Sequence, residues 1–279
     1  NLGLNIEHFE QLCREHNPSF AIIVHVLGHA NEMEDIQKIC NKYNIILIED
    51  ACEALGSVYK GKKLGSLSKS GSFSFYYGHH ISTIEGGVVV TDDTDLFNLM
   101  LSIRSHGWGR DVNNEYHDKW KKGYDIDEVR DLYTFYYPGF NLRSSDLNAF
   151  LGLSQLTKIE CLSKKRQENY NHYKSYLKNF WNQKSNTQLI SSFAYGILVE
   201  NRLEVYSHLK ENGIETRPLI CGSMGRHPFW IKKYGEERLK YADIIHNNGL
   251  YLPNHSNIGL DEVEYISQKF NEVAKPYFL

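Results

Sequence analysis

A polar turn between two apolar runs carries the residues of this chain that are best suited to chemistry. Hydroxyl and imidazole side chains crowd into it, namely Ser74, His79, His80, Ser82 and Thr83. Glycines within the same segment, residues 71–87, let the backbone approach a ligand closely or take positive φ angles. Such a turn can hold a phosphate next to a reacting group, and an imidazole moves protons near neutral pH. A histidine that only supports the fold would give the same pattern.

Two consecutive acids follow another apolar run. The run Ile45–Ile48 leads directly into Glu49 and Asp50. If this run is a strand of an open α/β sheet, its carboxyl end is where such sheets bind ligands. An acid that caps the next helix is the alternative at this spacing.

Paired histidines could also indicate a metal site, which needs a third ligand at suitable spacing. His25 and His29 are the available candidates, yet they lie on either side of Gly28 at the end of a predicted strand. We therefore predict no metal. The cysteines are odd in number and far apart, which argues against a disulfide framework and against a cysteine-rich metal site.

The segments that must position these residues alternate between helix and strand. Asn5 and Asn31 are predicted to cap two amphipathic helices. The predicted strands are Phe20–Leu27, Ile45–Ile48, Ser72–Tyr76 and Val88–Thr91. This alternation indicates a mainly parallel α/β layer. The wholly apolar run Ile45–Ile48 predicts a strand that is covered on both faces.

The second half of the chain changes character twice. Residues 108–138 form a polar, tyrosine-rich stretch, which predicts a long functional or partner-facing loop. Ser144 or Ser145 can cap a helix through Leu156, and a long charged helix follows to about Phe180. The later predicted elements are strands at 193–199 and 214–217, a helix at 202–212, and helices around Ala242 and Glu262. We therefore predict two domains, residues 1–140 and residues 141–279.

Composition excludes several classes of protein. The 41% hydrophobic and 23% charged fractions of this 279-residue chain are typical of globular proteins. A net charge of −3 offers no broad basic surface, so we do not expect a nucleic-acid binder held by phosphate contacts. No run approaches the roughly 18 apolar residues of a membrane span, and residues 1–10 lack the layout of a signal peptide. We therefore predict a cytoplasmic protein with no membrane segment.

Four stretches of the chain resemble, in order and in spacing, successive motifs of the DegT/DnrJ/EryC1/StrS sugar aminotransferase family. They are Val24–Gly28, Glu49–Gly56, Ser72–Asp92 and Pro138–Leu156. The resemblance implies an α/β fold of the pyridoxal phosphate (PLP) fold type I class, with a mostly parallel large domain and a smaller C-terminal α/β domain. It also implies a homodimer that acts on nucleotide-linked keto sugars at the subunit interface. The part of the family pattern that supplies the first strands and a glycine-serine turn is not found, so we expect an N-terminally incomplete large domain.

The resemblance also assigns roles to individual residues. Asp50 falls on the acid that pairs with the pyridine nitrogen of PLP and keeps it protonated. Ser74 falls on a phosphate-contacting serine, and Glu53 replaces the commoner glutamine near the ring. Asn141 falls on an asparagine that reaches the phosphate from the neighbouring subunit, and Arg143 is assigned to the substrate.

His79 stands where most of the family carries its cofactor-binding lysine. That position lies four residues beyond Phe75 and six before Glu85, and both counts end at His79. An imidazole forms no lasting Schiff base with PLP, but it can move protons. The resemblance therefore implies the lysine-free 3-dehydratases, which act on a GDP-4-keto-6-deoxymannose-like sugar with PLP, pyridoxamine phosphate (PMP) and glutamate. The scattered cysteines do not match the related iron-sulfur enzyme for CDP-linked sugars.

Two alternatives remain open at this point. A lysine that reaches the ring would give an ordinary sugar aminotransferase, although Lys69 lies before the predicted strand and would need a register shift. A chain without the first part of the family pattern could instead be an incomplete, non-catalytic homologue that binds a partner.

Overall fold

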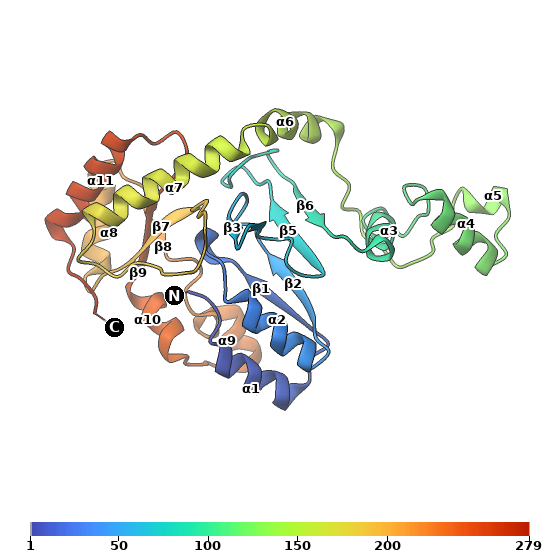
Figure 1. Cartoon of the computed structure of the whole chain (residues 1–279), viewed down its shortest axis with the longest axis horizontal. Helices are drawn as coiled ribbons and strands as arrows, with labels where there is room; N and C mark the ends of the chain where they lie inside the picture. The colour runs from blue at the N-terminus through green and yellow to red at the C-terminus, as the bar shows by residue number, and fades with distance from the viewer. Residues whose placement is uncertain (1, 279) are drawn as a thin grey trace.

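The computed structural model describes residues 2–278, which form two main sheets flanked by helices (Figure 1). The first sheet has the order β1-β2-β5-β6, and a separate hairpin joins β3 to β4. The bounds are β1 (Phe20–Val24), β2 (Ile46–Asp50), β3 (Val58–Tyr59), β4 (Lys62–Lys63), β5 (Ser70–Ser74) and β6 (Gly87–Val90). Strands β1, β2 and β5 are parallel and β6 is antiparallel at the edge, which confirms the mainly parallel layer.

The ends of β1 and β2 lie next to residues that were predicted to form the site. β1 ends before the short helix η1 (Val26–Gly28), in which Leu27 takes a left-handed φ of 55°. β2 continues through Glu49 and Asp50, because both residues pair with β1 and β5. Turns follow Asp50 instead of a helix, so this acid is not a helix cap.

Two helices, α1 (Ile6–His16) and α2 (Met33–Lys42), pack against one face of the first sheet. Their apolar side chains and those of the sheet form one buried cluster, which includes Cys13, Ile23, Met33, Ile36, Cys40 and Leu47. α2 is therefore amphipathic, as predicted, with Met33, Ile36, Ile39 and Cys40 buried.

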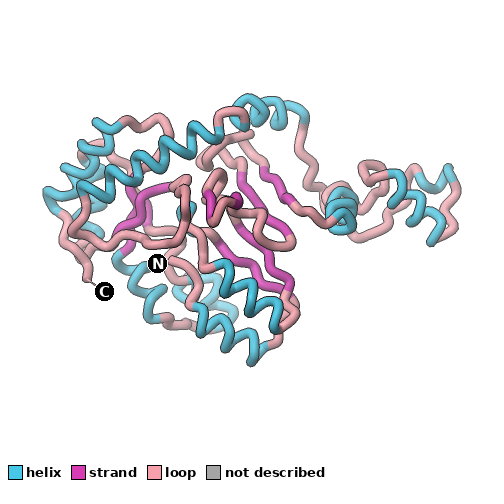
Figure 2. Tube along the Cα trace, viewed as in Figure 1, coloured by secondary structure: helices cyan, strands magenta, loops and turns pink. Residues whose placement is uncertain are grey.

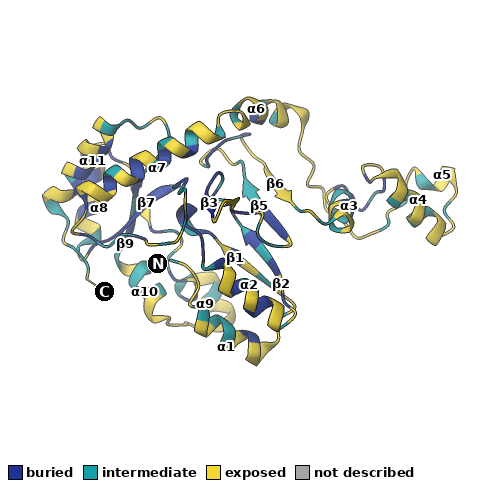
Figure 3. Ribbon diagram, viewed as in Figure 1, coloured by how far each residue is buried: buried dark blue, intermediate teal, exposed yellow. Residues whose placement is uncertain are grey.

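The opposite face of the first sheet is open within residues 2–278. Ile22 and Ile46 lie on it and are 58% and 52% exposed, and Figure 3 shows exposed residues along β1 and β6. The prediction that Ile45–Ile48 is covered on both faces is therefore wrong for the described chain. Alternate side chains of a strand point to opposite faces, and only one of these faces carries helices.

The caps of α1 and α2 differ from each other. Asn5 caps α1 as predicted and accepts a hydrogen bond from the backbone N–H of His8 at 2.9 Å. Asn31 does not cap α2, because its side-chain amide donates to the carbonyl oxygen of Val24 at 2.8 Å. α2 instead begins after Glu32, which makes no side-chain cap bond.

Residues 108–138, predicted as a loop, form an arm that projects from the first sheet (Figure 2). The arm contains α4 (Asn114–Gly123) and α5 (Glu128–Asp131). Within the arm, α5 is linked to α4, because the carboxylate of Asp131 accepts a hydrogen bond from Nε2 of His117 at 2.8 Å. The prediction of a loop was wrong because α4 consists mostly of polar and charged residues and has no buried residue, so a search for an apolar core-facing pattern misses it.

Helices on either side of the arm connect the two sheets. α3 (Thr94–Ile103) leads into the arm, and α6 (Asp146–Leu156) follows it. Ser145 caps α6 as predicted. α7 (Ile159–Tyr176) then runs to the second sheet, as Figure 1 shows.

The second sheet is antiparallel and has the order β7-β9-β8. The bounds are β7 (Ala194–Leu198), α8 (Arg202–Glu211), β8 (Arg217–Pro218), η2 (Met224–Arg226), α9 (Pro228–Tyr234), α10 (Lys240–Asn248), β9 (Gly249–Pro253) and α11 (Leu260–Val273). β9 and α9 have no counterpart among the predicted elements, and the strand predicted at 214–217 overlaps β8 only at Arg217. Among residues 2–278, no helix combines the length and the apolar character that crossing a bilayer requires.

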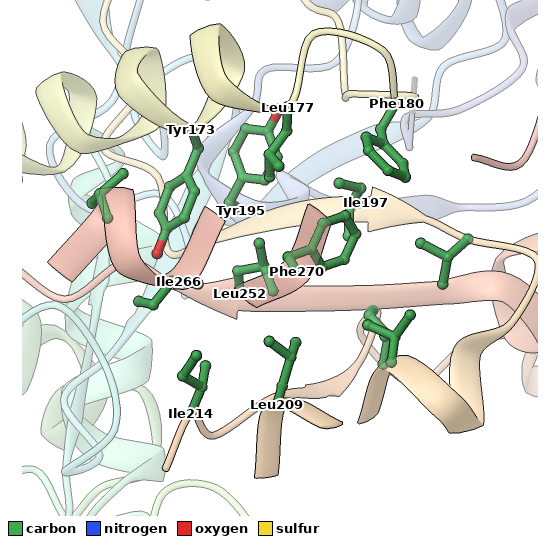
Figure 4. Packing of buried hydrophobic residues seen from close by; sticks show 14 of the residues in the cluster. Tyr173, Leu177, Phe180, Tyr195, Ile197, Leu209, Ile214, Leu252, Ile266 and Phe270 are labelled. Atoms are coloured by element: carbon green, nitrogen blue, oxygen red, sulfur yellow. The ribbon is translucent and has the colours of Figure 1, made fainter. Parts of the chain in front are cut away.

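A core of aromatic and aliphatic side chains fills the space around the second sheet (Figure 4). Tyr173 and Tyr195 stack with ring centroids 5.1 Å apart, and Phe180 meets Phe270 edge to face at 5.0 Å. A smaller cluster packs Leu27 of η1 against residues of the second sheet. The two sheets therefore share apolar contacts, and the domain boundary after residue 140 stays a prediction.

Candidate active site

The carboxyl ends of β2 and β5 bring two of the predicted site residues together. Asp50 is the last residue of β2 and pairs with Ser72 of β5, and Ser74 is the last residue of β5. Side chains two positions apart share a face of a strand, so Asp50, Ser72 and Ser74 point to the same side of the sheet. Because α1 and α2 cover the other side, this side is accessible to a ligand.

Glu49, next to Asp50, points to the covered side and serves the fold. Glu49 and His25 are both fully buried, and Nε2 of the imidazole donates to the carboxylate at 2.9 Å. The backbone N–H groups of Gly65 and Leu67 donate to the same carboxylate at 2.8 and 2.6 Å. Burial alone would raise the pKa of Glu49, but these hydrogen bonds hold the pKa below its ordinary value. The ionised carboxylate thus ties the segment after β4 to β1 and β2.

Asp50 and Glu53 differ in how they are engaged. Oδ1 of Asp50 accepts a hydrogen bond from the backbone N–H of Cys52 at 3.0 Å, and its Oδ2 makes none within residues 2–278. Glu53 accepts a hydrogen bond from the backbone N–H of Leu27 at 2.8 Å. Burial raises the pKa of Glu53, and the negative charge of Asp50 acts in the same direction. Asp50 therefore keeps a free carboxylate oxygen, whereas Glu53 holds η1 in its left-handed turn.

His79 is half-buried, and one of its ring nitrogens is already committed. Its Nδ1 lies 2.8 Å from the carbonyl oxygen of Cys52. A carbonyl oxygen can only accept, so Nδ1 carries the proton and Nε2 keeps its lone pair. The rings of Tyr76 and Phe193 lie near the imidazole, with centroid distances of 6.4 and 5.2 Å. This tautomer leaves Nε2 as the nitrogen that can take up a proton.

His80, the neighbouring histidine, is buried and serves the fold. Its Nε2 donates to the carbonyl oxygen of Ser191 at 2.8 Å. Burial lowers the pKa of His80 to about 3, and the positive charge of Arg166 acts in the same direction. His80 therefore stays neutral and cannot exchange protons near neutral pH.

The turn that carries both histidines is closed on itself and braced by α6. The backbone N–H of Phe75 donates to the carbonyl of Gly86 at 2.9 Å, and that of Thr83 donates to the carbonyl of Phe75 at 2.8 Å. The side-chain amide of Gln155 in α6 accepts from the N–H of Ser82 at 2.9 Å and donates to its carbonyl at 2.6 Å. The hydroxyls of Ser74, Ser82 and Thr83 also form hydrogen bonds with backbone groups of this turn and so help to shape it.

A cleft that the sequence pattern did not predict lies beside His79. It has a volume of about 250 Å³, and its lining includes Tyr76, Tyr77, Gly78, Phe193, Arg217 and Tyr251. Arg217 pairs with Glu215 at 2.8 Å, so the cleft presents both charges beside aromatic rings. In the sequence Arg217 falls inside a predicted strand, and no motif connects it with the turn at residues 71–87. Only the fold brings them together.

Asn141 and Arg143 lie apart from these residues in the single chain. Both are exposed in the segment between the arm and α6. Asn141 forms an isolated backbone bridge with Ser105, just after α3. Throughout residues 2–278, no hydrogen bond connects either of them to His79 or to the ends of β2 and β5.

The histidines considered as metal ligands have other partners. His25 is bound to Glu49, and Nδ1 of His29 lies 2.9 Å from Oγ of Ser185. Burial lowers the pKa of His29 to about 3. The described part of the chain contains no group of three His, Cys, Asp or Glu side chains placed to hold a metal ion.

A family model and several known proteins match this chain. The model of the DegT/DnrJ/EryC1/StrS aminotransferase family matches residues 3–271. GDP-4-keto-6-deoxy-D-mannose 3-dehydratase of Escherichia coli O55:H7 is 28% identical over 277 residues, which cover 96% of this chain and 71% of that protein. The protein of the same name from Yersinia pseudotuberculosis is 31% identical over 266 residues, which cover 91% and 66%. The chain therefore spans between 66% and 71% of the length of these two relatives.

The structural comparison supports the same grouping. The E. coli GDP-4-keto-6-deoxy-D-mannose 3-dehydratase, solved with bound hydrated PLP, has a TM-score of 0.85 at 27% identity and covers 96% of this chain and 71% of its own. This likeness confirms the PLP fold type I architecture. A UDP-4-amino-4,6-dideoxy-N-acetyl-β-L-altrosamine transaminase of Campylobacter jejuni is 32% identical over 248 residues, which cover 86% of this chain and 61% of that protein. Identity alone therefore does not separate a dehydratase from an aminotransferase.

Proposed function

The chain belongs to the DegT/DnrJ/EryC1/StrS aminotransferase family, and we propose that it is a 3-dehydratase that uses PLP or PMP. Its substrate would be a nucleotide-linked 4-keto-6-deoxy sugar such as GDP-4-keto-6-deoxymannose, with glutamate as the amine donor. The observation that carries this proposal is His79, an imidazole with a free Nε2 at the position where the family pattern places a lysine. Two relatives named as 3-dehydratases of this sugar support it, at 28% and 31% identity.

The ends of β2 and β5 fit a cofactor of the PLP type. The free carboxylate oxygen of Asp50 suits a protonated pyridine nitrogen, and the hydroxyl of Ser74 would bind the phosphate. Glu53, close enough to Asp50 to feel its charge, would stand near the ring. When bound, the cofactor supplies a conjugated ring that takes up the electron pair released on proton removal.

His79 would do the proton transfers of this reaction. Its Nε2 would take up the proton whose removal releases the electron pair to the cofactor ring. It would return this proton to the C3 hydroxyl as that group leaves, while Nδ1–H stays bonded to the carbonyl of Cys52. A lysine amine at this place would instead allow ordinary transamination. Lys69, the lysine considered as a substitute, pairs with Asp93.

An apolar stripe on α6 supports a homodimer with shared sites. Leu147, Phe150 and Leu153 follow each other at helical spacing and are 67%, 72% and 63% exposed. A contiguous exposed apolar surface of this kind marks a protein contact. Asn141 and Arg143 precede this helix directly, so we propose that an α6 contact brings them to the site of the neighbouring subunit.

The product of the reaction tests the proposal. With PMP, glutamate and GDP-4-keto-6-deoxymannose, we expect a 4-keto-3,6-dideoxy sugar and released ammonia, measured by mass spectrometry and NMR. His79→Asn keeps some hydrogen bonding but removes the titratable base. The rate should therefore fall by about 100- to 10,000-fold, while PMP binding, followed by ultraviolet-visible titration, should persist. His227→Asn is the matched control, because His227 also bonds a backbone carbonyl, that of Cys221 at 2.7 Å.

Other products would identify the competing functions. A 4-amino sugar that keeps its C3 hydroxyl would identify an aminotransferase, as the name of the C. jejuni relative suggests. Borohydride treatment separates the two further, because a lysine-linked cofactor would leave a pyridoxyl-lysine peptide and His79 would leave none. A chain that binds neither PLP nor PMP would match the third possibility, an incomplete, non-catalytic homologue.

A further inference from the structure

Helix α7 buries a positive charge that has no acidic partner in the described chain. Arg166 is 2% exposed, and within residues 2–278 its hydrogen bonds go to backbone carbonyls and not to a carboxylate. Burial lowers the pKa of Arg166 to about 10, so the guanidinium is still charged at neutral pH. Burying a cation without a counter-charge is costly. This cost indicates a specific role for Arg166.

The guanidinium of Arg166 holds the short segment that precedes β7. Its Nη1 donates to the carbonyl oxygens of Ser192 at 3.2 Å, Phe193 at 3.1 Å and Asn254 at 2.6 Å. Asn254 in turn donates to the carbonyls of Ser192 and Arg166, both at 3.1 Å. Hydrogen bonds from a charged donor are stronger than neutral ones. Residues 191–193 are therefore fixed to α7 and to the end of β9.

The same segment contacts both histidines of the turn. The ring centroid of Phe193 lies 5.2 Å from that of His79 and 5.9 Å from that of His80. The carbonyl of Ser191 accepts the hydrogen bond of His80. The imidazole of His79 is thus held on one side by the carbonyl of Cys52 and on another by the ring of Phe193.

We propose that Arg166 and Phe193 are positioning residues for His79. Arg166 fixes Phe193 through its backbone carbonyl, and the ring of Phe193 keeps the imidazole in the rotamer in which Nδ1 faces Cys52. A half-turn of the imidazole would put a carbon at the Cys52 carbonyl and would redirect Nε2. The catalytic meaning of this inference rests on the proposed function, in which Nε2 moves the proton. Neither Arg166 nor Phe193 needs to touch the reacting atoms.

The tautomer of His79 tests this inference without cofactor or substrate. Nitrogen-15 NMR of the histidine-labelled chain reports which ring nitrogen carries the proton, and the His79→Asn spectrum identifies the signal. We expect His79 to be mainly protonated at Nδ1. Phe193→Leu removes the ring contact and should raise the fraction protonated at Nε2 by about two- to tenfold, the range expected for losing one aromatic contact. Phe193→Tyr keeps the ring and should restore the wild-type signal.

Two further variants distinguish a specific effect on the His79 ring from a general loosening of the packing. Phe180→Leu makes the same change in the core around the second sheet, where Phe180 packs on Phe270, and should leave the His79 signal unchanged. Arg166→Met, if it folds, should shift the tautomer in the same direction as Phe193→Leu. An unchanged signal in folded Phe193→Leu, an equal shift in Phe180→Leu, or a wild-type ring without a preferred tautomer would each overturn the inference. Because no turnover is measured, these outcomes are independent of whether the dehydratase proposal holds.

Discussion

Replacing Glu49 with glutamine should destabilise the chain strongly, although the two side chains have nearly the same shape. The carboxylate accepts four hydrogen bonds from buried or half-buried donors. Oε2 accepts from His25 at 2.9 Å and Gly65 at 2.8 Å, and Oε1 accepts from Leu67 at 2.6 Å and Ser68 at 2.9 Å. In glutamine an NH₂ group, which cannot accept, replaces one of these oxygens.

The less costly arrangement places the new NH₂ group at the position of Oε1. The hydroxyl of Ser68 can turn away, but the backbone N–H of Leu67 cannot, so one half-buried donor loses its partner at a cost of about 1–3 kcal/mol. The bonds that remain also lose the charge, and bonds to charged groups contribute about 1.5–3 kcal/mol against about 1 kcal/mol for neutral ones. We therefore expect the free energy of unfolding to fall by about 2–5 kcal/mol.

Urea unfolding at neutral pH, followed by circular dichroism, measures this difference. Glu10→Gln is the control, because Glu10 pairs with Lys42 at 2.7 Å on the surface and exposed pairs contribute little. The lowered pKa of Glu49 adds a second signature. Its stabilisation is present above the ordinary value of 4.5 and is lost as the pH falls through the lower folded value, so the variant should lack this acid-dependent component. A loss no larger than that of Glu10→Gln would refute the reasoning.

Two other predictions concern acid stability and assembly. Burial lowers the pKa of His29 and His80 to about 3 from 6.5, so only the unfolded chain binds these protons between the two values. Stability should therefore fall with decreasing pH by up to about 1.4 kcal/mol per pH unit for each histidine, and His29→Gln should remove one such contribution; equal slopes in urea unfolding would contradict this. Phe150→Asp in the α6 stripe should convert a dimer to a monomer in light scattering, whereas Leu203→Asp, at a 76% exposed position of α8, should not. A monomeric wild type would count against the α6 contact.

The elements that could be predicted from the sequence are those whose apolar residues face a core. Met33, Ile36 and Ile39 of α2 recur at helical spacing, and all three are buried. α4 could not be predicted in this way, because none of its residues is buried in a core. The cap of α2 was mispredicted for another reason: the amide of Asn31 finds a better partner in the carbonyl of Val24, which only the folded chain brings near.

In the candidate site, too, some residues can be found from motif spacing, whereas others are brought together only by folding. Motif spacing points to Asp50 and His79, whose roles stay predictions. The spacing also separates His79 from His80, but only the fold shows how their surroundings differ, because His79 contacts the carbonyl of Cys52 whereas His80 is buried. Motif spacing could not find Phe193, whose ring meets His79 only after the chain has folded back over more than a hundred residues.

The alternation of side chains along β2 gives two neighbouring acids different surroundings. Glu49 faces inward and accepts four hydrogen bonds that maintain the fold, whereas Asp50 faces the open side and accepts one, from the backbone N–H of Cys52. A lineage that abandoned the reaction should therefore retain Glu49 while Asp50 drifts, and a lineage still under selection for catalysis should retain both. The same reasoning applies to His80 and His79. Comparing the two pairs among descendants of this protein would show when an enzyme became a scaffold, even where the fold has not changed.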